Sequence, residues 1–386
     1  MGEITVSFRA DSVREAGLRD QQGDVPRTSA AASDGACAVG TQGAPGADPM
    51  TFEEVFSFEN LLDAASECCN GVRWKSSTQV FESTILMRVA SLYRQLHSGT
   101  WESMGFNRFV IRERGKVRNI QAVHISERVV QKCLVRNCLR PLVVPKLIAD
   151  SYATLPGKGT EAAIAKHREH LRWWYARHGR DGSVAVMDYH DYFASIDHSK
   201  LKAMYAELPM DSRLLDLTCS LIDCFDGSKG IGLGSEVSQI SAVLYVNPID
   251  HLVKDELGIH CYGRYMDDCY MIGEKHQIRD AMDAVAEASA ELNLALNQKA
   301  TQIRPLTQGW HYLKKRVSIT ESGRVVMKLE RKNIKRERKR IASNRAAVEA
   351  GTMPQESASQ SFRSWEAYAS RYDAHRTIET VKRLYL

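Results

Sequence analysis

The sequence predicts an α+β fold, in which short strands and hairpins lie among helices. β-Forming residues flank two adjacent acids, Asp267 and Asp268, which is typical of two short strands joined by a turn. A further apolar run, residues 183–187, is typical of a buried strand. Apolar residues recur at helical spacing before residue 100, and a strongly basic stretch follows residue 330. With 386 residues, the chain is long enough to bury a sizeable core.

The first 50 residues differ in composition from the rest of the chain. Residues 28–49 are rich in Ala, Gly, Ser and Asp and hold few large apolar residues. Such a segment buries little surface, so residues 1–50 are predicted to be a disordered N-terminal tail. Helical spacing begins after Thr51 and recurs in residues 85–96, which predicts a helical N-terminal extension over residues 51–104.

Residues 105–120 are predicted to form a hairpin. A β-forming run leads to Gly115, which suits a turn, and a second strand follows it. Lys116 and Arg118 alternate with apolar residues on that strand, so both would point to one face. A solvated charged strand is the alternative on these residues alone.

The apolar run that ends at Asp188 is predicted to be a buried strand, with Asp188 at its carboxyl end. The chain then turns into a helix that begins near Asp197, where Asp-His-Ser-Lys offers an N-cap. Asp191 and Asp197 are rival candidates for a functional acid. We expect Asp197 to cap the helix and Asp191 to be a solvated loop acid.

Asp267 and Asp268 lie inside an apolar frame. Carboxylates in such a place indicate a positively charged partner, and hard oxygen ligands suit Mg²⁺. We predict a metal site that handles phosphates. A solvated hairpin turn is the alternative, because Asp is common in turns.

Residues 232–239 precede an apolar stretch and are predicted to start a helix. Gly232 and Gly234 bracket Leu233, and glycine permits close backbone approach to a flat ligand. Ser238-Gln239 closes the run. An ordinary Gly-rich helix start is the alternative.

The C-terminal region carries the clearest electrostatic signal. The net charge is only +5, but basic residues crowd one predicted helix: Arg331, Lys332, Lys335, Arg336, Arg338, Lys339, Arg340 and Arg345. Such clusters contact nucleic-acid phosphates without reading sequence, whereas a solvated helix face is the alternative. Trp365, Tyr368 and Tyr372 lie on the final helical stretch at spacings that favour core packing.

The nine cysteines include no Cys-x-x-Cys pair, which argues against zinc fingers and structural disulfides. No apolar run reaches transmembrane length, and the N-terminus has no signal pattern. These observations predict a cytoplasmic protein with reduced thiols and no membrane partner.

In order along the chain, these segments resemble the motifs of reverse transcriptases. Residues 188–198 look like the first palm motif, residues 231–239 like the second, and Tyr265-Met266-Asp267-Asp268 like the third. Other segments resemble the finger motifs and the last two motifs of the family: residues 115–120, 127–131, 151–159, 296–301 and 309–313. The resemblance is to bacterial and phage enzymes and covers roughly residues 75–325.

The resemblance implies a right-hand polymerase fold: a palm with an antiparallel sheet, fingers and a helical thumb. Residues 105–325 would form the fingers and palm, and residues 326–386 the basic helical thumb. The implied enzyme is an RNA-directed DNA polymerase, a nucleotidyltransferase that extends a DNA or RNA primer on an RNA template with dNTPs. Two Mg²⁺ ions, for which Mn²⁺ can substitute, would be its cofactors. A cognate non-coding RNA or an accessory protein is a further candidate partner.

The resemblance also implies roles for individual residues. Asp188, Asp267 and Asp268 would be catalytic and would hold the metal ions together with the backbone carbonyl of Tyr189. The nucleotide-binding residues would be Lys116, Arg118, Phe193, Gly234, Ser238, Gln239 and Lys299, with Phe193 excluding the 2′-hydroxyl of ribonucleotides. The nucleic-acid-binding residues would be Tyr265, Met266, Arg331, Lys332, Lys335, Arg336, Lys339 and Arg340.

Three positions depart from the common family pattern. Leu233-Gly234, three residues, then Ser238-Gln239 replaces Gln-Gly, three residues, then Ser-Pro. That form is similar to reverse transcriptases of diversity-generating retroelements and of defence-associated or unclassified groups, and it puts accurate copying in doubt. Ala300 stands where many relatives have Lys, and Lys299 would substitute for it. Lys314 stands where a Gly often follows the Leu of the primer-grip motif.

We therefore expect a polymerase of a diversity-generating retroelement or a prophage element. A phage-defence reverse transcriptase, with or without a template, is one alternative. A non-catalytic RNA-binding splicing helper is another, although the presence of all three predicted acids argues against it. The sequence shows neither a Cys/His cluster for an attached nuclease nor a further acidic set for an RNase H domain.

Overall fold

The computed structural model describes residues 50–113 and 116–385. The tail predicted for residues 1–50 lies outside the described residues, apart from Met50. Helices occupy the region that follows: α1 (Phe52–Val55), α2 (Phe58–Cys69), α3 (Ser76–Ser83) and α4 (Ile85–His97). Thr51 and Glu54 cap α1 reciprocally, each side chain bonding the other residue's backbone N–H.

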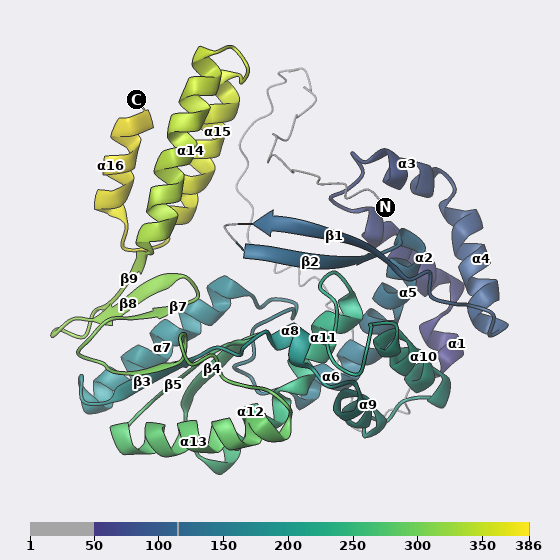
Figure 1. The fold of residues 1–386 in the computed structure, drawn as a ribbon, viewed down its shortest axis with the longest axis horizontal. Coiled ribbons are helices and arrows are strands. Elements are labelled where there is room, and N and C mark those ends of the chain that lie inside the picture. The colour runs from purple at the N-terminus through teal and green to yellow at the C-terminus, as the bar shows by residue number, and fades with distance from the viewer. Residues whose placement is uncertain (1–49, 114–115, 386) are drawn as a thin grey trace, which may run out of the picture. The chain divides into compact units, whose positions relative to one another are not determined.

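The hairpin predicted for residues 105–120 is confirmed. Strands β1 (Phe106–Glu113) and β2 (Lys116–Val123) pair antiparallel along their whole length. Its tip, residues 114–115, lies outside the described residues. Figure 1 shows the hairpin extending from the N-terminal helices.

A four-stranded antiparallel sheet forms the centre of the fold. Its spatial order is β4-β5-β3-β6, where the strands are β3 (Ser183–Met187), β4 (Cys261–Tyr265), β5 (Asp268–Gly273) and β6 (Gln302–Pro305). The predicted strand before Asp188 and the predicted hairpin around Asp267 are therefore both confirmed. The mixture of helices with antiparallel sheets confirms the predicted α+β class.

The two faces of this sheet enter different cores, because successive strand residues point to opposite sides. Ala185 and Met187 pack with α13 (Lys275–Glu291), whereas Val184 and Val186 pack with α7 (Thr160–His178) and with a second sheet. Figure 1 shows α13 and α7 on the two sides of the central strands.

Most of the remaining helices lie on the side of the N-terminal region in Figure 1. They are α5 (Ile125–Leu134), the π-helix η1 (Val135–Leu139), α6 (Arg140–Val143), the 3₁₀-helix η2 (Val144–Lys146), α8 (Tyr192–Ser195), α9 (His198–Ala206), α10 (Ser212–Asp223), α11 (Glu236–Tyr245), α12 (Asn247–His251) and the π-helix η3 (Leu252–Glu256).

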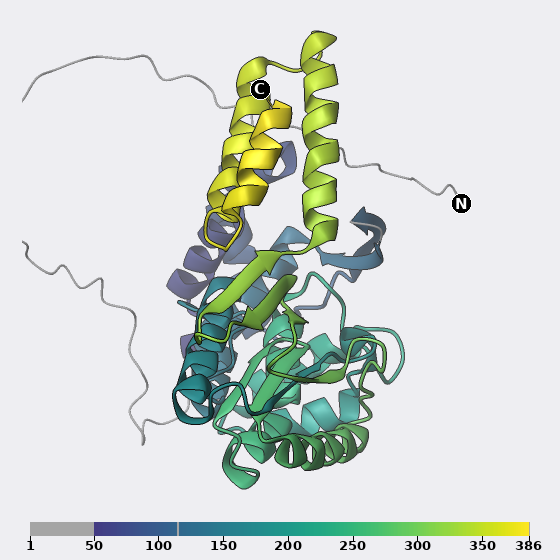
Figure 2. The same cartoon turned by 90° about the vertical axis from the view of Figure 1, so that its left-hand side faces the viewer.

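The second sheet is three-stranded and leads into the C-terminal helices. Strands β7 (Trp310–Tyr312), β8 (Lys315–Ile319) and β9 (Val325–Leu329) are followed by α14 (Arg331–Glu349), α15 (Gln355–Ala369) and α16 (His375–Tyr385). On the buried side of this sheet, Trp310 Nε1 donates to Nε2 of the buried His167, 3.2 Å away. Figure 2 shows the three helices standing side by side beyond the sheet.

The three aromatic residues pack inward as predicted, but the prediction that all three lie on the final helical stretch was wrong. Trp365 and Tyr368 lie on α15, whereas Tyr372 lies in the turn that follows it. The helix ends at Ala369, and Tyr372 Oη donates to Glu161 Oε1 of α7 at 2.8 Å. The Lys315 ammonium lies 4.9 Å from the Tyr368 ring centre and 4.5 Å from that of Tyr372.

The eight described cysteines carry free thiols, and Cys37 lies outside the described residues. Burial raises the pKa of the Cys68, Cys133, Cys138 and Cys261 thiols to about 12. Cys219 and Cys224, on and just after α10, are only partly buried. Among the described residues, none of the helices combines the length and the apolar character needed to cross a bilayer.

Candidate active site

The central sheet brings the three predicted catalytic acids together at one end of its strands, where β3 ends and β5 begins. Met187, the last residue of β3, pairs with Cys269 of β5, so one further step of the antiparallel register sets Asp188 opposite Asp268. Tyr265 pairs with Asp268 across the β4–β5 hairpin, which places Asp267 in its two-residue turn. All three acids are half-buried, so they remain open to solvent-borne ligands.

A segment near residue 297 orients Asp188. Asn297 Nδ2 donates to Asp188 Oδ2 at 3.0 Å, and the Asn297 backbone N–H donates to the Asp188 carbonyl at 2.8 Å. The Asp188 N–H in turn donates to the Thr301 hydroxyl at 3.4 Å. The sequence motif over residues 296–301 indicated this segment, but not that Asn297 holds the acid. Lys299, predicted to bind nucleotide, is exposed in the same segment.

The two rival acids have the roles expected of them. Asp197 caps α9 by accepting from the N–H groups of Ser199 and Lys200, at 3.0 and 3.2 Å. Burial opposes its charged form, but the hydrogen bonds from Lys200, Asn293 and Ser199 outweigh this and lower the pKa of Asp197. Asp191 is exposed in the loop before α8 and pairs with His190.

The acids fit a magnesium site that is completed by substrate. Among residues 50–113 and 116–385, no three His, Cys, Asp or Glu side chains are placed to hold a metal ion by themselves. Mg²⁺ is commonly bound by one or two carboxylates together with substrate phosphates, rather than by a closed protein cage. Half-exposed carboxylates at strand ends match that mode. Tyr189 could contribute only its backbone carbonyl, because its side chain is buried.

A fully buried ion pair lies beneath the turn that carries Asp267. Arg264 and Asp250 are both 0% exposed. Arg264 Nε donates to both Asp250 oxygens, at 2.8 and 2.9 Å, and Nη2 lies 2.5 Å from Oδ2. Its remaining donors reach the carbonyls of Val243, at 3.0 Å, and Met266, at 3.2 Å. The pair therefore ties the turn to α11 and α12, and nothing in the sequence pattern had suggested it.

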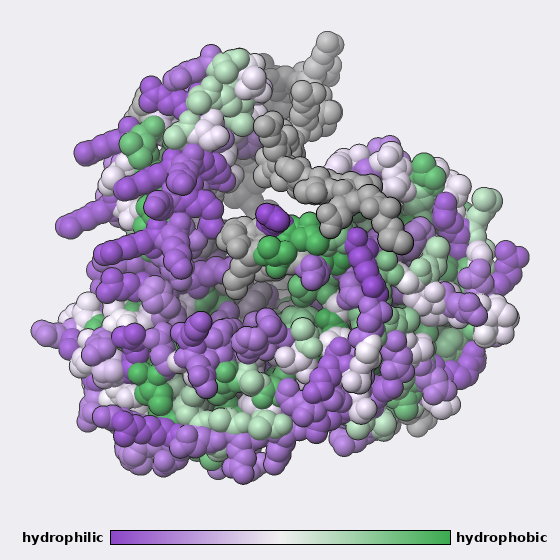
Figure 3. All heavy atoms as spheres, in the orientation of Figure 1, coloured by the Kyte–Doolittle hydropathy of each residue, from purple (hydrophilic) through white to green (hydrophobic). Residues whose placement is uncertain are grey.

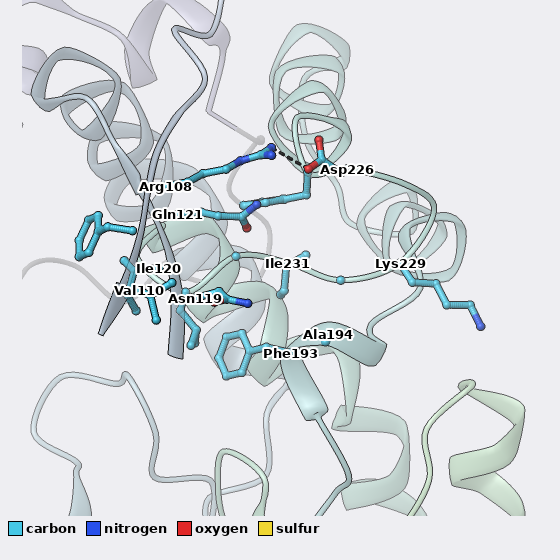
Figure 4. A pocket seen from close by; sticks show the side chains of 15 residues that line it. Arg108, Val110, Asn119, Ile120, Gln121, Phe193, Ala194, Asp226, Lys229 and Ile231 are labelled. Atoms are coloured by element: carbon cyan, nitrogen blue, oxygen red, sulfur yellow. Dashed lines mark ion pairs between the residues drawn. The ribbon is translucent and has the colours of Figure 1, made fainter. Parts of the chain in front are cut away.

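A cavity of about 540 Å³ opens between the β1–β2 hairpin, α8 and the loop before α11 (Figure 4). Phe193, the predicted sugar gate, lines it and is half-buried. Arg108 of β1 bridges to Asp226 of the loop at 2.6 Å. Asn119 and Gln121, which sequence reasoning missed, also line the cavity from β2. Asn119 lies on the predicted second strand, whereas Gln121 lies one residue beyond the hairpin predicted for residues 105–120.

Gly232 and Gly234 both lie close to Gln121 of β2. A Cβ on Gly232 would lie 2.4 Å from both Gln121 Oε1 and Phe225 Cε1. The close approach is thus to protein, because the loop packs against β2 and the Gln121 N–H donates to the Leu233 carbonyl at 3.3 Å. Gly234 is exposed with φ 119°, a conformation that favours glycine.

The predicted helix start is confirmed, since α11 begins after the N-cap Ser235. Gln131 of α5 accepts from the Ser235 hydroxyl at 2.8 Å and so fixes this end of the helix. Ser238, predicted to bind nucleotide, is buried, and its hydroxyl has no hydrogen-bond partner among the described residues. Gln239 is exposed. The structure therefore presents Gln239, and not Ser238, at the surface.

The remaining predicted contacts lie on two elements. Lys116 and Arg118 are two residues apart on β2, but their side chains lie outside the described part of the structure. The predicted basic helix is the single helix α14, and all eight basic residues predicted for it are exposed: Arg331, Lys332, Lys335, Arg336, Arg338, Lys339, Arg340 and Arg345. Of these, Arg340 pairs with the buried Glu337 at 2.7 Å, and Arg336 donates to Asn333.

The β7–β8 turn lies beside the acids. Tyr312 packs its ring 5.0 Å from that of Tyr270, two residues after Asp268. Burial raises the pKa of Tyr312, and the negative charge of Asp268 adds to the effect. The next two residues, Leu313 and Lys314, form the turn with φ of 44° and 60°. The departure at Lys314 thus keeps the left-handed backbone that a glycine would adopt easily.

Comparison with known proteins adds a family match. The sequence model of the reverse transcriptase (RNA-dependent DNA polymerase) family matches residues 110–315. No curated protein sequence matches the chain.

Solved structures similar to this chain include two telomerases. Telomerase from Candida albicans in complex with a TWJ fragment of telomeric RNA has a TM-score of 0.46 and 10% identity, over 73% of this chain and 55% of that one. Apo telomerase from Candida tropicalis, truncated from its C-terminal domain, has a TM-score of 0.45 and 11% identity, over 57% of this chain and 54% of that one. The chain thus spans about half the length of these telomerase chains.

Proposed function

We propose that this chain, which belongs to the reverse transcriptase (RNA-dependent DNA polymerase) family, extends a primer with dNTPs on an RNA template. The observation that carries the proposal is the antiparallel register, which brings Asp188, Asp267 and Asp268 together at one end of the central strands. The reaction would be a nucleotidyl transfer, in which the primer 3′-oxygen attacks the α-phosphate and pyrophosphate leaves.

The three acids would hold two Mg²⁺ ions, or Mn²⁺ in their place, with the Tyr189 carbonyl as a further oxygen ligand. Bound ions of this kind lower the pKa of an attacking hydroxyl and neutralise phosphate charge. Asn297 keeps the Asp188 carboxylate in one orientation, because it bonds both that side chain and the same residue's carbonyl. The buried Arg264 supports the turn of Asp267 through the Met266 carbonyl.

The cavity beside α8 would seat the incoming nucleotide and the base that pairs with it. Phe193 would lie against the sugar and exclude a 2′-hydroxyl. Lys116, Arg118 and Lys299 would contact the triphosphate, since Arg and Lys bind phosphate oxygens with charge assistance. Of residues 234–239, Gly234 and Gln239 remain available for contact, and Ser238 would need the helix start to shift.

The nucleic acid would extend from the acids toward the C-terminal helices. Tyr265 and Met266 would meet the primer end, and the exposed cations of α14 would contact phosphates of the primer–template. A cognate non-coding RNA or an accessory protein would fit as a further partner. On this proposal residues 105–325 are fingers and palm, residues 326–386 thumb, and the enzyme works in the cytoplasm.

The biological setting we propose is a diversity-generating retroelement or a prophage element. Its support is the sequence form Leu233-Gly234 followed by Ser238-Gln239. Primer extension would be measured on an RNA template, on a DNA template and without a template. Synthesis that requires the RNA template would distinguish this setting from an untemplated polymerase of phage defence.

Primer extension by acid-to-amide variants tests the catalytic proposal. Asp188→Asn, Asp267→Asn and Asp268→Asn should each reduce extension at least about 10²-fold, as loss of an electrostatic group in an active site commonly does. Asp191→Asn is the matched control, because it removes the same charge from an exposed loop residue three positions after Asp188. Thermal unfolding should be similar in all four. Extension by Asp267→Asn at the rate of the control would end the catalytic proposal.

A further inference from the structure

A second, smaller cavity of about 180 Å³ lies in the N-terminal helical region and shares no lining residue with the cavity beside α8. Its walls come from α4, from the segment after α4 and from the start of α5, and include Arg88, Ser91, Leu92, Trp101, Met104 and Ser126. Pockets for whole small molecules usually measure about 300–1,000 Å³, so this cavity has the size of a single side chain. We call it the α4 pocket.

Hydrogen bonds fix the floor of the α4 pocket. Glu127 is only 1% exposed, and its carboxylate accepts from the Ser103 hydroxyl at 2.8 Å and from the Met104 N–H at 3.1 Å. Gln131 Nε2 donates to the same carboxylate at 3.1 Å, and Gln131 accepts from Ser235, the N-cap of α11. The floor is therefore preformed, and three donors already match the charge of Glu127.

The walls of the α4 pocket carry donors that have no acceptor in the described part of the chain. The Arg88 side chain makes one hydrogen bond there, from Nε to the Thr84 hydroxyl at 2.9 Å, which leaves its two Nη groups. No described carboxylate pairs with Arg88, although Glu102 lines the same pocket. The Trp101 indole N–H and the Ser126 hydroxyl also lack a partner among these residues. A carboxylate ligand would satisfy all of these donors.

Exposed apolar side chains flank the α4 pocket. Met104 is 64% exposed, and Met87, which lies one helical turn before Ser91 on α4, is 71% exposed. Methionine is frequent at binding surfaces because its side chain adapts to the partner. Figure 3 shows hydrophobic and hydrophilic residues mixed over the region of α3 and α4, whereas the region of α14 is largely hydrophilic. A mixed surface of this kind is typical of a protein interface.

The charge of the region argues against a nucleic acid as the ligand. Residues 51–104 hold seven acidic residues and four Lys or Arg, a net charge of −3, in a chain whose net charge is +5. Such a surface repels a polyanion. It suits a segment in which one acid lies beside apolar and basic residues. Arg88 would meet the acid, the methionines the apolar residues, and the exposed Glu102 a cation.

We propose that the α4 pocket docks a partner protein through one Asp or Glu side chain of a short segment whose neighbouring residues are apolar and basic. Arg88 would bind the carboxylate through both Nη groups, and the Trp101 N–H and the Ser126 hydroxyl would complete its hydrogen bonds. A few anchor side chains in preformed pockets commonly supply most of the affinity of an interface. The proposal does not depend on the proposed polymerase function.

The test uses the peptide acetyl-Lys-Leu-Glu-Leu-Lys-amide as the probe. Its dissociation constant is measured by NMR from the indole N–H signal of Trp101, which is assigned with Trp101→Phe. A second peptide with Gln in place of Glu should bind about 10-fold more weakly, as loss of a charge-assisted hydrogen bond commonly does. A third peptide with Lys at that position should not move the signal.

Matched variants separate the pocket from the general charge of α4. Arg88→Gln should weaken binding of the Glu peptide about 10-fold and abolish its preference over the Gln peptide. Arg94→Gln removes the same charge from an exposed position of α4 that does not line the pocket, and should leave the affinity unchanged. Ser126→Ala removes one donor without the Thr84 contact of Arg88, and should weaken binding even if Arg88→Gln unfolds at a lower temperature.

Equal binding of the Glu and Gln peptides, or equal losses in Arg88→Gln and Arg94→Gln, would overturn the proposal. Preference for the Lys peptide would mean that the pocket takes a basic side chain. Displacement of the Glu peptide by a ten-nucleotide single-stranded RNA would favour a nucleic acid instead. A Trp101 signal that moves with protein concentration alone would make a second copy of this chain the occupant. Loss of primer extension in Asp267→Asn with unchanged peptide binding would leave both proposals standing.

Discussion

Replacing Arg264 with Met should lower the free energy of unfolding by about 3–5 kcal/mol, because it leaves a buried carboxylate without its counter-ion. Arg264 supplies the hydrogen bonds to both Asp250 oxygens. In its absence Asp250 would retain the Tyr262 hydroxyl, 2.6 Å from Oδ1. The loss is large beside the roughly 5–15 kcal/mol that holds a typical domain together.

The same substitution on the edge strand provides the control. Arg304 of β6 is exposed, and within the described residues its side chain bonds only Gln302 of the same strand, at 2.7 Å, so Arg304→Met should change stability by no more than about 0.5 kcal/mol. Urea unfolding followed by circular dichroism gives both values. Equal midpoints for the two variants would show that the buried pair does not stabilise the central sheet.

A double substitution separates stability from catalysis. Arg264→Met/Asp250→Leu removes both charges, and such replacements of a buried pair are often neutral or stabilising. The Val243 and Met266 carbonyls still lose a donor, so we expect stability to recover only in part, by at least about 2 kcal/mol over the single variant. Primer extension should stay low, because the turn of Asp267 has lost its tether at Met266. Recovery of wild-type extension would mean that Arg264 serves the fold alone.

Three further changes have defined outcomes. Phe193→Val should raise the ratio of kcat/KM for ribonucleotides to kcat/KM for deoxyribonucleotides about 10-fold, since about 1.4 kcal/mol of relieved clash is worth tenfold in rate. An unchanged ratio would contradict the assignment of Phe193 as the sugar gate. Lys314→Gly should stabilise the chain by about 1 kcal/mol, because Lys314 is held at φ 60° at a cost that glycine avoids; a lower unfolding temperature would contradict this. Burial and the charge of His170 lower the pKa of His167 to about 3. Below about pH 6.5 this histidine is therefore protonated in the unfolded chain but neutral in the folded chain, and stability is lost as the pH falls. His167→Gln should therefore reduce the slope of unfolding free energy against pH between 6.5 and 4.5 by up to about 1.4 kcal/mol per pH unit, and an unchanged slope would mean that His167 does not carry the acid sensitivity.

The features predictable from the sequence are those that depend on local periodicity. The hairpins, the strand before Asp188, the cap at Asp197 and the helix start after Ser235 are confirmed, because each depends on residues a few positions apart. The close contact of Gly232 with Gln121 and Phe225 could not be predicted, because the tertiary fold brings these neighbours to it. The hydrogen bond from Asn297 to Asp188 could not be predicted for the same reason, because the two residues are far apart in the sequence.

The buried Arg264 could not be anticipated for a related reason. Charged residues beside a strand turn are usually solvated or bind ligand, and the placement of Asp250 by α12 makes the complete burial of Arg264 favourable. The cavity is likewise assembled from three separate parts of the chain.

Because most of the thiols are buried, a fluorophore can be attached selectively beside the cavity. A maleimide reacts with thiolates, and thiols whose pKa is raised to about 12 are almost wholly protonated at pH 7. Cys224 is partly exposed and directly precedes Phe225 and Asp226, which line the cavity. With Cys37 and the partly buried Cys219 replaced by Ser, a fluorophore placed on Cys224 would sit at the cavity wall without any engineered cysteine. Its emission would report whether a nucleotide or a template base enters first.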